Sequence, residues 1–261
     1  MMSKFSLWFL PVFAMVGAGC SVHVYSPPAR VPSLESAATV GEGKTGVALG
    51  GGYHGELFGG EIVAGTGRVR HGLDDKTDIV GEASLLGSVN SNDTGTEQPG
   101  RYGALGYVGL KRAVTDYLSL QAGLGGGGYA FGGFVAASGG AVLAWENPYV
   151  VPFLSTEIGT SLPVGGTEQV VSFEDDGKLH SQLHRPSVTG YGSATLGLRI
   201  PIVFGDGPIK SMNLLGGMSL LYLMSDDSRI ANVGQGTRSP VDSDFQDSGY
   251  VGLQGALEVV F

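Results

Sequence analysis

The last thirteen residues of the chain, GYVGLQGALEVVF at positions 249–261, alternate between large apolar side chains and small or polar ones. On one face of an extended chain lie Val251, Leu253, Gly255, Leu257, Val259 and Phe261, and on the other Gly252, Gln254, Ala256, Glu258 and Val260. A period of two residues is typical of a β-strand whose two faces meet different surroundings. The end of the chain is therefore predicted to be a strand between an apolar medium and a filled interior.

The same alternation recurs along the chain from Lys44 onward. We predict ten strands, at residues 45–53, 58–70, 77–89, 102–112, 117–128, 135–145, 149–161, 188–200, 208–223 and 249–261. Most are long enough for the ~9–11 residues with which a tilted strand crosses a bilayer. The fold class indicated is all-β, a transmembrane antiparallel up-and-down β-barrel of about ten strands over residues 44–261, with eight or twelve strands as alternatives.

The predicted connections fall into two alternating sets. Short turns are expected at residues 71–76, 113–116, 146–148 and 201–207, and the opposite set is 54–57, 90–101, 129–134, 162–187 and 225–248. Every long connection lies in the second set, and membrane barrels have short turns at the periplasmic end and longer loops outside. We therefore expect the amino terminus on the periplasmic side, together with the short turns.

Aromatic residues collect at the ends of the predicted strands. The set expected at the outer end is Tyr53, Phe58, Tyr102, Tyr129, Phe131, Phe134, Tyr191, Tyr222 and Tyr250, and the inner set is Tyr117, Trp145, Tyr149, Phe204 and Phe261. Two such girdles are typical of a membrane barrel, because aromatic rings with a polar edge settle at the membrane interface. Only Tyr107 and Phe153 fall in the middle of a strand.

The end of the chain resembles the assembly signal of bacterial outer-membrane β-barrels, with Phe261 terminal and Val259 and Leu257 on the same face. Residues 109–111 and 115–118 resemble the strand, turn and strand of small barrels of the outer-membrane protein A type. The resemblance implies an outer-membrane location, with outer-membrane lipids and the barrel-assembly machinery as partners. A soluble, lipocalin-like barrel is the alternative.

Composition excludes several other classes. The 261 residues include 46 glycines, which argues against a mostly helical domain, since each interior glycine costs about 1 kcal/mol relative to alanine. The single cysteine excludes an internal disulfide, and with it an iron–sulfur cluster or a structural zinc site. A formal net charge of −9 makes nucleic acid an unsuitable partner. The glycines are expected on lumen-facing or bending positions of a small barrel.

The first twenty residues form a secretory signal, with Lys4, an apolar stretch over residues 5–16 and small residues before Cys20. This order resembles the lipobox of bacterial lipoproteins, although Gly17 stands where that family has leucine. The resemblance implies a lipoprotein signal peptide at 1–19 and a lipidated (palmitate-bearing) Cys20. Cleavage after Cys20 by an ordinary signal peptidase is the alternative. Residues 20–43, rich in proline and serine, are predicted to be a flexible tether.

Assigning strand faces places six charged side chains in the lumen: Glu61, Glu82, Lys111, Glu157, Arg199 and Glu258, with Gln121 and Gln254 beside them. A charge on the lipid side would cost ~2–4 kcal/mol at the midplane. These groups either line a water path or pair with one another. We expect pairing, between Glu82 and Lys111 and between Glu258 and Arg199, because a ten-stranded barrel is little wider than one whose side chains fill it.

The connection at 162–187 contains His180 and His184, whose spacing would let them share a helical face and bind a metal. No third ligand is fixed, so neither a metal site nor a cofactor is expected, and no catalytic constellation is recognisable. His54, at an outer strand end near Glu56, is the remaining candidate base.

Three functions are compatible with these features. The first is a non-enzymatic cell-envelope protein with a structural or surface-interaction role, meeting an extracellular ligand or protein through the connections at 162–187 and 225–248. The second is a porin-like pore or transporter through the charged lumen. The third is a membrane-embedded hydrolase.

Overall fold

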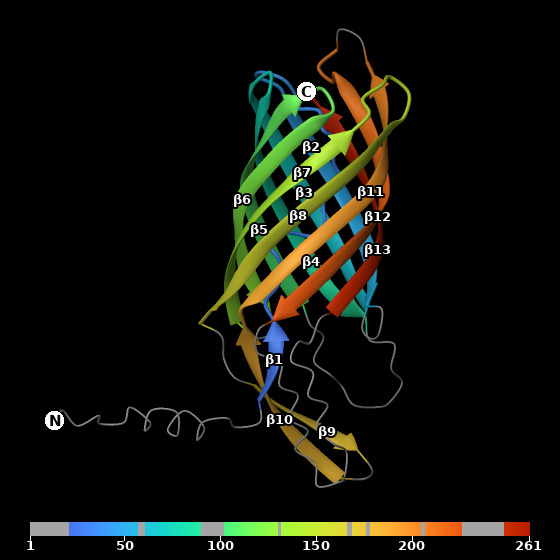
Figure 1. Ribbon diagram of the computed structural model, residues 1–261. Helices are drawn as coiled ribbons and strands as arrows, with labels where there is room; N and C mark the ends of the chain where they lie inside the picture. Colours follow the sequence, from blue (N-terminus) through green and yellow to red (C-terminus); the bar gives the residue numbers. More distant parts are fainter. Residues whose placement is uncertain are drawn as a thin grey trace, which may run out of the picture.

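The computed structural model describes residues 21–56, 61–89, 102–129, 132–165, 169–175, 178–204, 207–225 and 248–261. Within them, ten strands close into one antiparallel barrel and three more form a separate sheet at one end of it (Figure 1). The barrel strands are β2 (Thr45–Glu56), β3 (Glu61–Asp74), β4 (Thr77–Val89), β5 (Tyr102–Thr115), β6 (Leu118–Tyr129), β7 (Gly132–Ala144), β8 (Val151–Val164), β11 (Thr189–Val203), β12 (Ser211–Ser225) and β13 (Ser248–Val260).

This barrel confirms the predicted fold class and all ten predicted strands. Each strand pairs with its sequence neighbours, except that β8 pairs with β11 and β13 pairs with β2. The β13–β2 pairing runs from Tyr250↔Glu56 to Val260↔Gly46 and closes the cylinder, which leaves no unpaired barrel edge. The strand β3 continues past its predicted end at residue 70 to Asp74, because pairing extends into the tight turn, where Asp74 pairs with Thr77 of β4.

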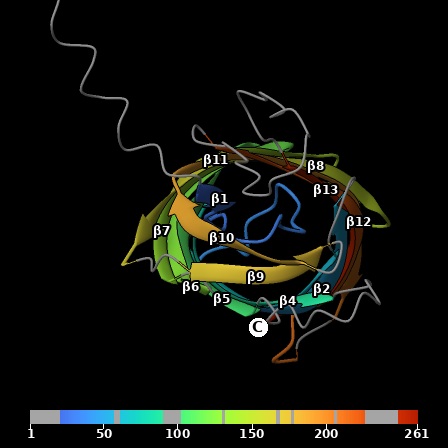
Figure 2. The same ribbon diagram turned by 90° about the horizontal axis from the view of Figure 1, so that it is seen from below.

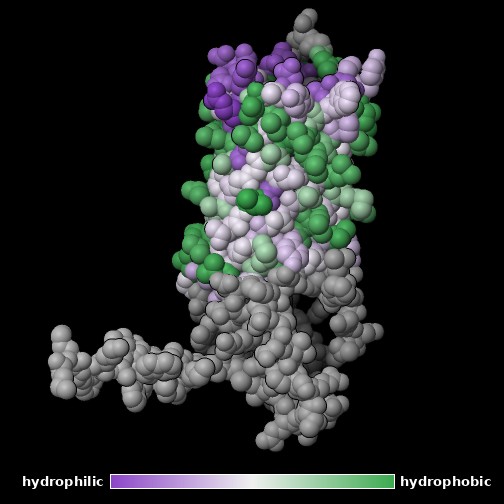
Figure 3. Space-filling view, viewed as in Figure 1, coloured by the Kyte–Doolittle hydropathy of each residue, from purple (hydrophilic) through white to green (hydrophobic). Residues whose placement is uncertain are grey.

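The outer wall of the barrel is apolar. Leu85 is 70% exposed and Ile158 is 73% exposed, although both lie in the middle of strands. In the view of Figure 3 the barrel wall is largely green and pale, while strongly hydrophilic residues gather at the end that carries the short turns. A water-soluble barrel rarely exposes so much contiguous apolar surface, so the wall is suited to lipid. No helix in the described residues is long and apolar enough to span a membrane.

The aromatic residues match the predicted girdles only in part. The five residues of the inner set, Tyr117, Trp145, Tyr149, Phe204 and Phe261, are all exposed, as are Tyr53 and Tyr222 at the other end. The prediction is wrong for Phe134 and Tyr191, which are each 2% exposed and face the interior. Tyr129 and Tyr250 are half-buried against the core, while Phe58, Phe131 and the side chain of Tyr102 lie outside the described part.

Inward-facing rings explain several of the glycines. A Cβ at Gly109 or Gly123 would lie 2.5 Å from the hydroxyl oxygen of Tyr107, and a Cβ at Gly197 would lie 2.3 Å from the Phe153 ring. Tyr107 and Phe153 therefore fill the lumen. Room for them is made by Gly109 on the same strand as Tyr107 and by Gly123 and Gly197 on neighbouring strands.

A three-stranded sheet, which the sequence did not predict, stands at the end opposite the short turns. It contains β1 (Ser21–Tyr25), β10 (Lys178–Ser187) and β9 (Gln169–Asp175) in that order, with β1 parallel to β10. His180 and His184 lie in β10, where extended backbone separates residues four apart by about 13 Å. The helical pairing behind the metal alternative is therefore wrong.

The small sheet also corrects the expected course of the amino-terminal segment. The short turns at 75–76 and 116–117 and the carboxyl end lie at one end of the barrel, whereas β1 lies at the other, with β9 and β10 (Figure 1). An amino terminus on the same side as the short turns is therefore wrong for the residues that begin at Ser21.

Candidate functional site

Residues 26–43, which the sequence predicted to be a flexible tether, run through the lumen of the barrel. Seen along the barrel axis, this blue segment lies inside the ring of strands (Figure 2). Ala29, Glu35 and Ala37 are at most 1% exposed. The segment is not a free tether, because the barrel wall supplies hydrogen-bond and ion-pair partners along it. We call residues 26–43 the plug.

At the end near the small sheet, the plug is fixed by polar groups around the start of β11. The Ser26 amide donates to Thr189 Oγ1 at 2.8 Å, and its hydroxyl donates to the Ser187 carbonyl at 2.8 Å. The Ala29 amide donates to the Tyr191 hydroxyl at 3.0 Å. The inward-facing Tyr191 therefore binds plug backbone, which explains why it does not belong to the girdle.

Arg30 links the plug to acidic groups on two wall strands. Its Nε donates to Glu157 Oε2 at 2.7 Å, and a terminal nitrogen lies 3.9 Å from a carboxylate oxygen of Glu82. The guanidinium also lies 4.6 Å from the centre of the Tyr107 ring, a cation–π contact. Because all of these side chains are buried, the pairs are shielded from water and salt.

Glu35 links the plug to a basic group of the wall. Its carboxylate lies 3.2 Å from Lys111 Nζ, accepts from the Ser33 hydroxyl at 2.9 Å and lies 3.3 Å from Arg30. Two cations, Lys111 and Arg30, therefore flank one buried carboxylate, an arrangement that favours its ionised form.

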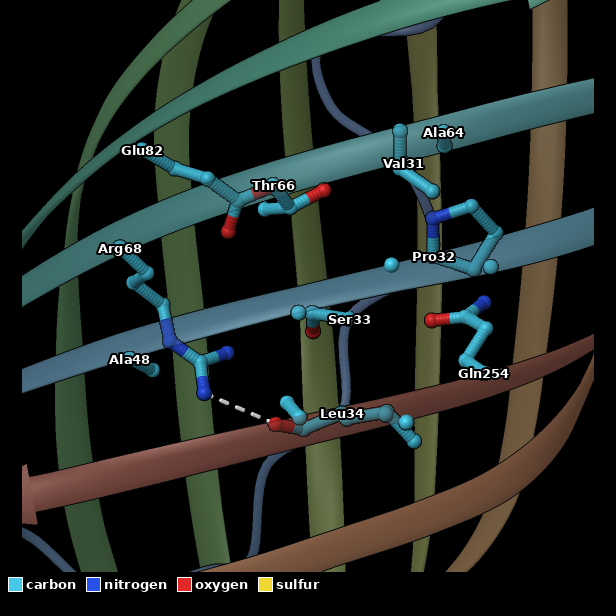
Figure 4. Close-up of a pocket in the computed structure, with 15 residues that line it drawn as sticks. Val31, Pro32, Ser33, Leu34, Ala48, Ala64, Thr66, Arg68, Glu82 and Gln254 are labelled. Carbon is cyan, nitrogen blue, oxygen red and sulfur yellow. Dashed lines mark hydrogen bonds between the residues drawn. The ribbon is translucent and has the colours of Figure 1, made fainter.

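Wall cations also bind the carbonyl groups of the plug. Arg68 donates to the Leu34 carbonyl at 2.8 Å, as Figure 4 shows, and Arg70 donates to the Ala38 carbonyl at 3.2 Å. Lys111 donates to the carbonyls of Ser36 and Ala38. These hydrogen bonds satisfy carbonyl groups of the plug, which is not part of a β-sheet.

The plug leaves the lumen at the end with the short turns. The Val40 amide donates to the buried carboxylate of Asp78 at 3.1 Å, and the Thr39 hydroxyl donates to the Asp75 carbonyl at 2.8 Å. The Gly43 amide donates to the Gly72 carbonyl at 3.0 Å. Polar contacts thus hold the segment from one mouth of the barrel to the other.

The structure places most of the predicted luminal charges inside, with different partners. Glu82, Lys111, Glu157 and Glu258 are buried in the lumen, Arg199 is half-buried, and the side chain of Glu61 lies outside the described part. Both expected pairs are wrong: Glu258 pairs with Arg70 at 2.6 Å and Arg199 with Glu146, while Glu82 and Lys111 face the plug. The wall groups do not pair across the lumen because the plug occupies its centre.

Arg30, Glu35, Arg68, Arg70 and Asp78 are the buried charges that the sequence analysis missed. A signal for the first two was available: Arg30 and Glu35 are the only Asp, Glu, Lys or Arg residues between positions 21 and 41. The six predicted luminal residues comprise four acids and two bases, an imbalance that requires further cations. Strict alternation counted from an inward Glu61 turns Arg68 and Arg70 outward, which is why both were overlooked.

In the middle of the barrel little free space remains beside the plug, whereas a hollow of about 360 Å³ lies at the short-turn end, lined by Thr39 and Val40 of the plug and by wall residues such as Arg199. The cavity shown in Figure 4, lined by plug residues 31–34 and by Arg68, Glu82 and Gln254 among others, has a volume of about 40 Å³. At roughly 10–15 Å³ of such volume for one water, it holds a few water molecules. The middle of the lumen is therefore filled with protein.

One serine–histidine pair lies in the lumen. His54 is buried, its Nδ1 is 3.4 Å from Ser219 Oγ, and Ser219 accepts a hydrogen bond from Gln254 at 2.8 Å. The separation exceeds the ~2.6–3.2 Å typical of a nucleophile and its base. Nε2 of His54 has no hydrogen-bond partner among the described residues, so no acid orients the ring there. The arrangement is a polar contact, and it supplies no support for a hydrolase.

The fit between plug and wall predicts a steric effect at Gly125. A Cβ there would lie 2.5 Å from the Ala29 carbonyl oxygen, whereas a Cβ at Gly81, also on a wall strand, meets nothing within 4 Å. We expect Gly125→Val to lower the free energy of unfolding by about 1–3 kcal/mol through overpacking. Gly81→Val is the control and should change it by less than about 0.5 kcal/mol. Urea unfolding in lipid vesicles measures both, and equal losses would contradict a packed plug.

Comparisons with known proteins give the following results. No family model matches the chain, and no curated protein matches it. Among solved structures, Neisserial surface protein A is similar at 10% identity and a TM-score of 0.28, covering 83% of this chain and 95% of that one. A deletion variant of TodX, a monoaromatic hydrocarbon channel, matches at 9% identity and 0.26, covering 84% and 90%. OccK11 of Pseudomonas aeruginosa matches at 10% identity and 0.21, covering 88% and 100%. None of these similarities bears on a ligand or an activity of this chain.

Proposed function

We propose that this chain is a non-enzymatic outer-membrane β-barrel whose lumen is closed by its own amino-terminal segment and whose long-loop end carries a surface-interaction site. The observation that carries the proposal is the plug, whose Arg30 and Glu35 meet opposite charges of the wall. A pore would need a continuous water path, and the plug occupies it. The apolar outer wall supports a position in the outer membrane.

The interaction site is assigned to the three-stranded sheet and its neighbouring loops. This sheet projects beyond the barrel at the end of the long connections (Figure 1). Binding groups commonly lie on loops positioned by a rigid scaffold, and a closed barrel is such a scaffold. An extracellular ligand or protein is the partner that this placement supports.

The experiment combines gel mobility with electrical recording. The purified protein should migrate differently before and after boiling, as a closed barrel does, and should give no steady conductance in a planar lipid bilayer. A single heat-independent band would overturn the barrel in the membrane. Steady conductance of the native protein, altered in Glu157→Gln, would favour the pore instead.

Lipidation of Cys20 remains a part of this proposal that rests on the sequence, since residues 1–20 lie outside the described part. We expect labelled palmitate to be incorporated into the native protein. Incorporation should fall to background in Cys20→Ser, because the cysteine sulfur is the atom to which the lipid is attached. A serine nearby, Ser21→Ala, is the control and should retain the label. Equal labelling of native protein and Cys20→Ser would refute the anchor.

A further inference from the structure

The amino-terminal segment crosses the whole length of the barrel, and its direction is fixed by its contacts. Ser26 binds Ser187 and Thr189, at the end where β10 passes into β11. Gly43 binds Gly72 at the opposite end, beside the turn from β3 to β4. Thr45 then begins β2 and exchanges backbone hydrogen bonds with Phe261.

The residues before the plug are held outside the lumen by the small sheet. β1 pairs with β10 in parallel register, from Ser21↔Leu183 to Tyr25↔Ser187. β10 belongs to the connection between β8 and β11, which lies at the same end as the connections at 90–101 and 226–247. The amino-terminal strand and all long connections therefore share one end of the barrel.

This arrangement makes two expectations from the sequence incompatible. Long connections outside the cell and an amino terminus in the periplasm cannot both hold, because β1 lies with the long connections. Short turns at the periplasmic end are a general property of outer-membrane barrels. The connection lengths therefore decide between the two, in favour of long connections outside.

We propose that the chain is threaded through its own barrel, so that its amino-terminal strand β1 is displayed on the outer surface of the cell. This inference rests on the proposed outer-membrane location. It goes beyond that location, because a barrel in the outer membrane does not need to have its amino terminus outside the cell. The first residues of the processed protein, and any group attached to them, then lie at the outer leaflet. The interaction sheet is composite, with one strand supplied from the far end of the sequence.

Cysteine labelling on intact cells tests the threading. A membrane-impermeant maleimide should label Val22→Cys or His23→Cys, two adjacent positions of β1, and Thr94→Cys in the connection between β4 and β5. Lys76→Cys lies in the turn between β3 and β4, and its maleimide labelling should increase at least about tenfold when the cells are permeabilised. The protein without an added cysteine gives the background that Cys20 contributes.

The outcomes separate failure of the threading from failure of the proposed function. Labelling of Thr94→Cys without either β1 variant, on intact cells, overturns the threading and leaves the outer-membrane barrel standing. Labelling of Lys76→Cys alone shows an inverted barrel and overturns the surface display. No labelling of any variant before permeabilisation overturns both proposals.

A cross-link that does not depend on access from outside supplies the second measurement. Val22 is the register partner of His184 in the β1–β10 pair. Oxidation of Val22→Cys/His184→Cys should give a disulfide-linked species in most of the folded protein, whereas Val22→Cys/Lys76→Cys, at opposite ends, should give none. A cross-link in the second variant, or its absence in the first, overturns the threading.

Discussion

Deletion of residues 26–40 is expected to convert a barrel that conducts no ions into a conducting one. We expect discrete, salt-dependent conductance steps in planar bilayers for this variant, against none for the native protein. The reason is electrostatic and steric together: without the plug, Glu82, Glu157 and Lys111 lose their partners and line a hydrated lumen. Charged side chains around water in place of a packed segment permit ions to pass.

Two controls make the conductance result interpretable. The deletion variant must keep the gel shift between unheated and boiled samples, which shows that the barrel still closes. Removal of residues 230–240, between β12 and β13, shortens the chain but leaves residues 26–40 in the sequence, and this variant should give no conductance. A folded deletion variant that conducts no ions would show that the plug is not what closes the lumen.

The Glu35–Lys111 pair gives the second large effect. Both side chains are almost fully buried, so removing Glu35 leaves the Lys111 charge without its acidic partner, and removing Lys111 leaves Glu35 with Arg30 alone. We expect Lys111→Met alone to cost about 3–5 kcal/mol in the free energy of unfolding, and Glu35→Gln alone a similar amount. The double variant should lose clearly less than the sum of the two, because neither charge is left without its partner.

A more exposed ion pair provides the matched control. Glu146 pairs with Arg199, and both side chains are partly open to solvent. Glu146→Gln should therefore cost no more than about 1 kcal/mol. Unfolding by urea in lipid vesicles measures all four variants. Strict additivity of the Glu35 and Lys111 effects would mean that the two groups do not interact in the folded protein.

The barrel was predictable from the sequence because its strands obey one local rule. Alternation fixes which residues of β13 face lipid, and the β13–β2 pairing follows from closing the sheet. Phe134 and Tyr191 escaped the same rule because an aromatic ring at a strand end is equally compatible with a girdle and with an inward core position. To distinguish the two positions one must know which alternate residues of the strand face the lumen, and this depends on how the strand pairs with its neighbours.

The plug could not be predicted in this way because it has no repeating pattern of its own. Pro27, Pro28 and Pro32 exclude a helix and give the segment an extended course, which describes a tether and a luminal segment equally well. What holds it is the pairing of Arg30 with Glu157 and of Glu35 with Lys111, which lie 127 and 76 positions away along the chain. Such long-range pairs are visible only after the barrel closes.

Closure of the barrel at one particular seam sets an order for assembly. The segment that fills the lumen runs directly into β2, and β2 forms the seam with β13, which is made after the other barrel strands. Entry into a finished cylinder would require residues 21–25 to travel its full length past inward arginines and glutamates. Closing the seam around a segment already in place requires no such passage. We therefore expect the ion pairs of the lumen to act as an internal template, around which the two end strands find each other.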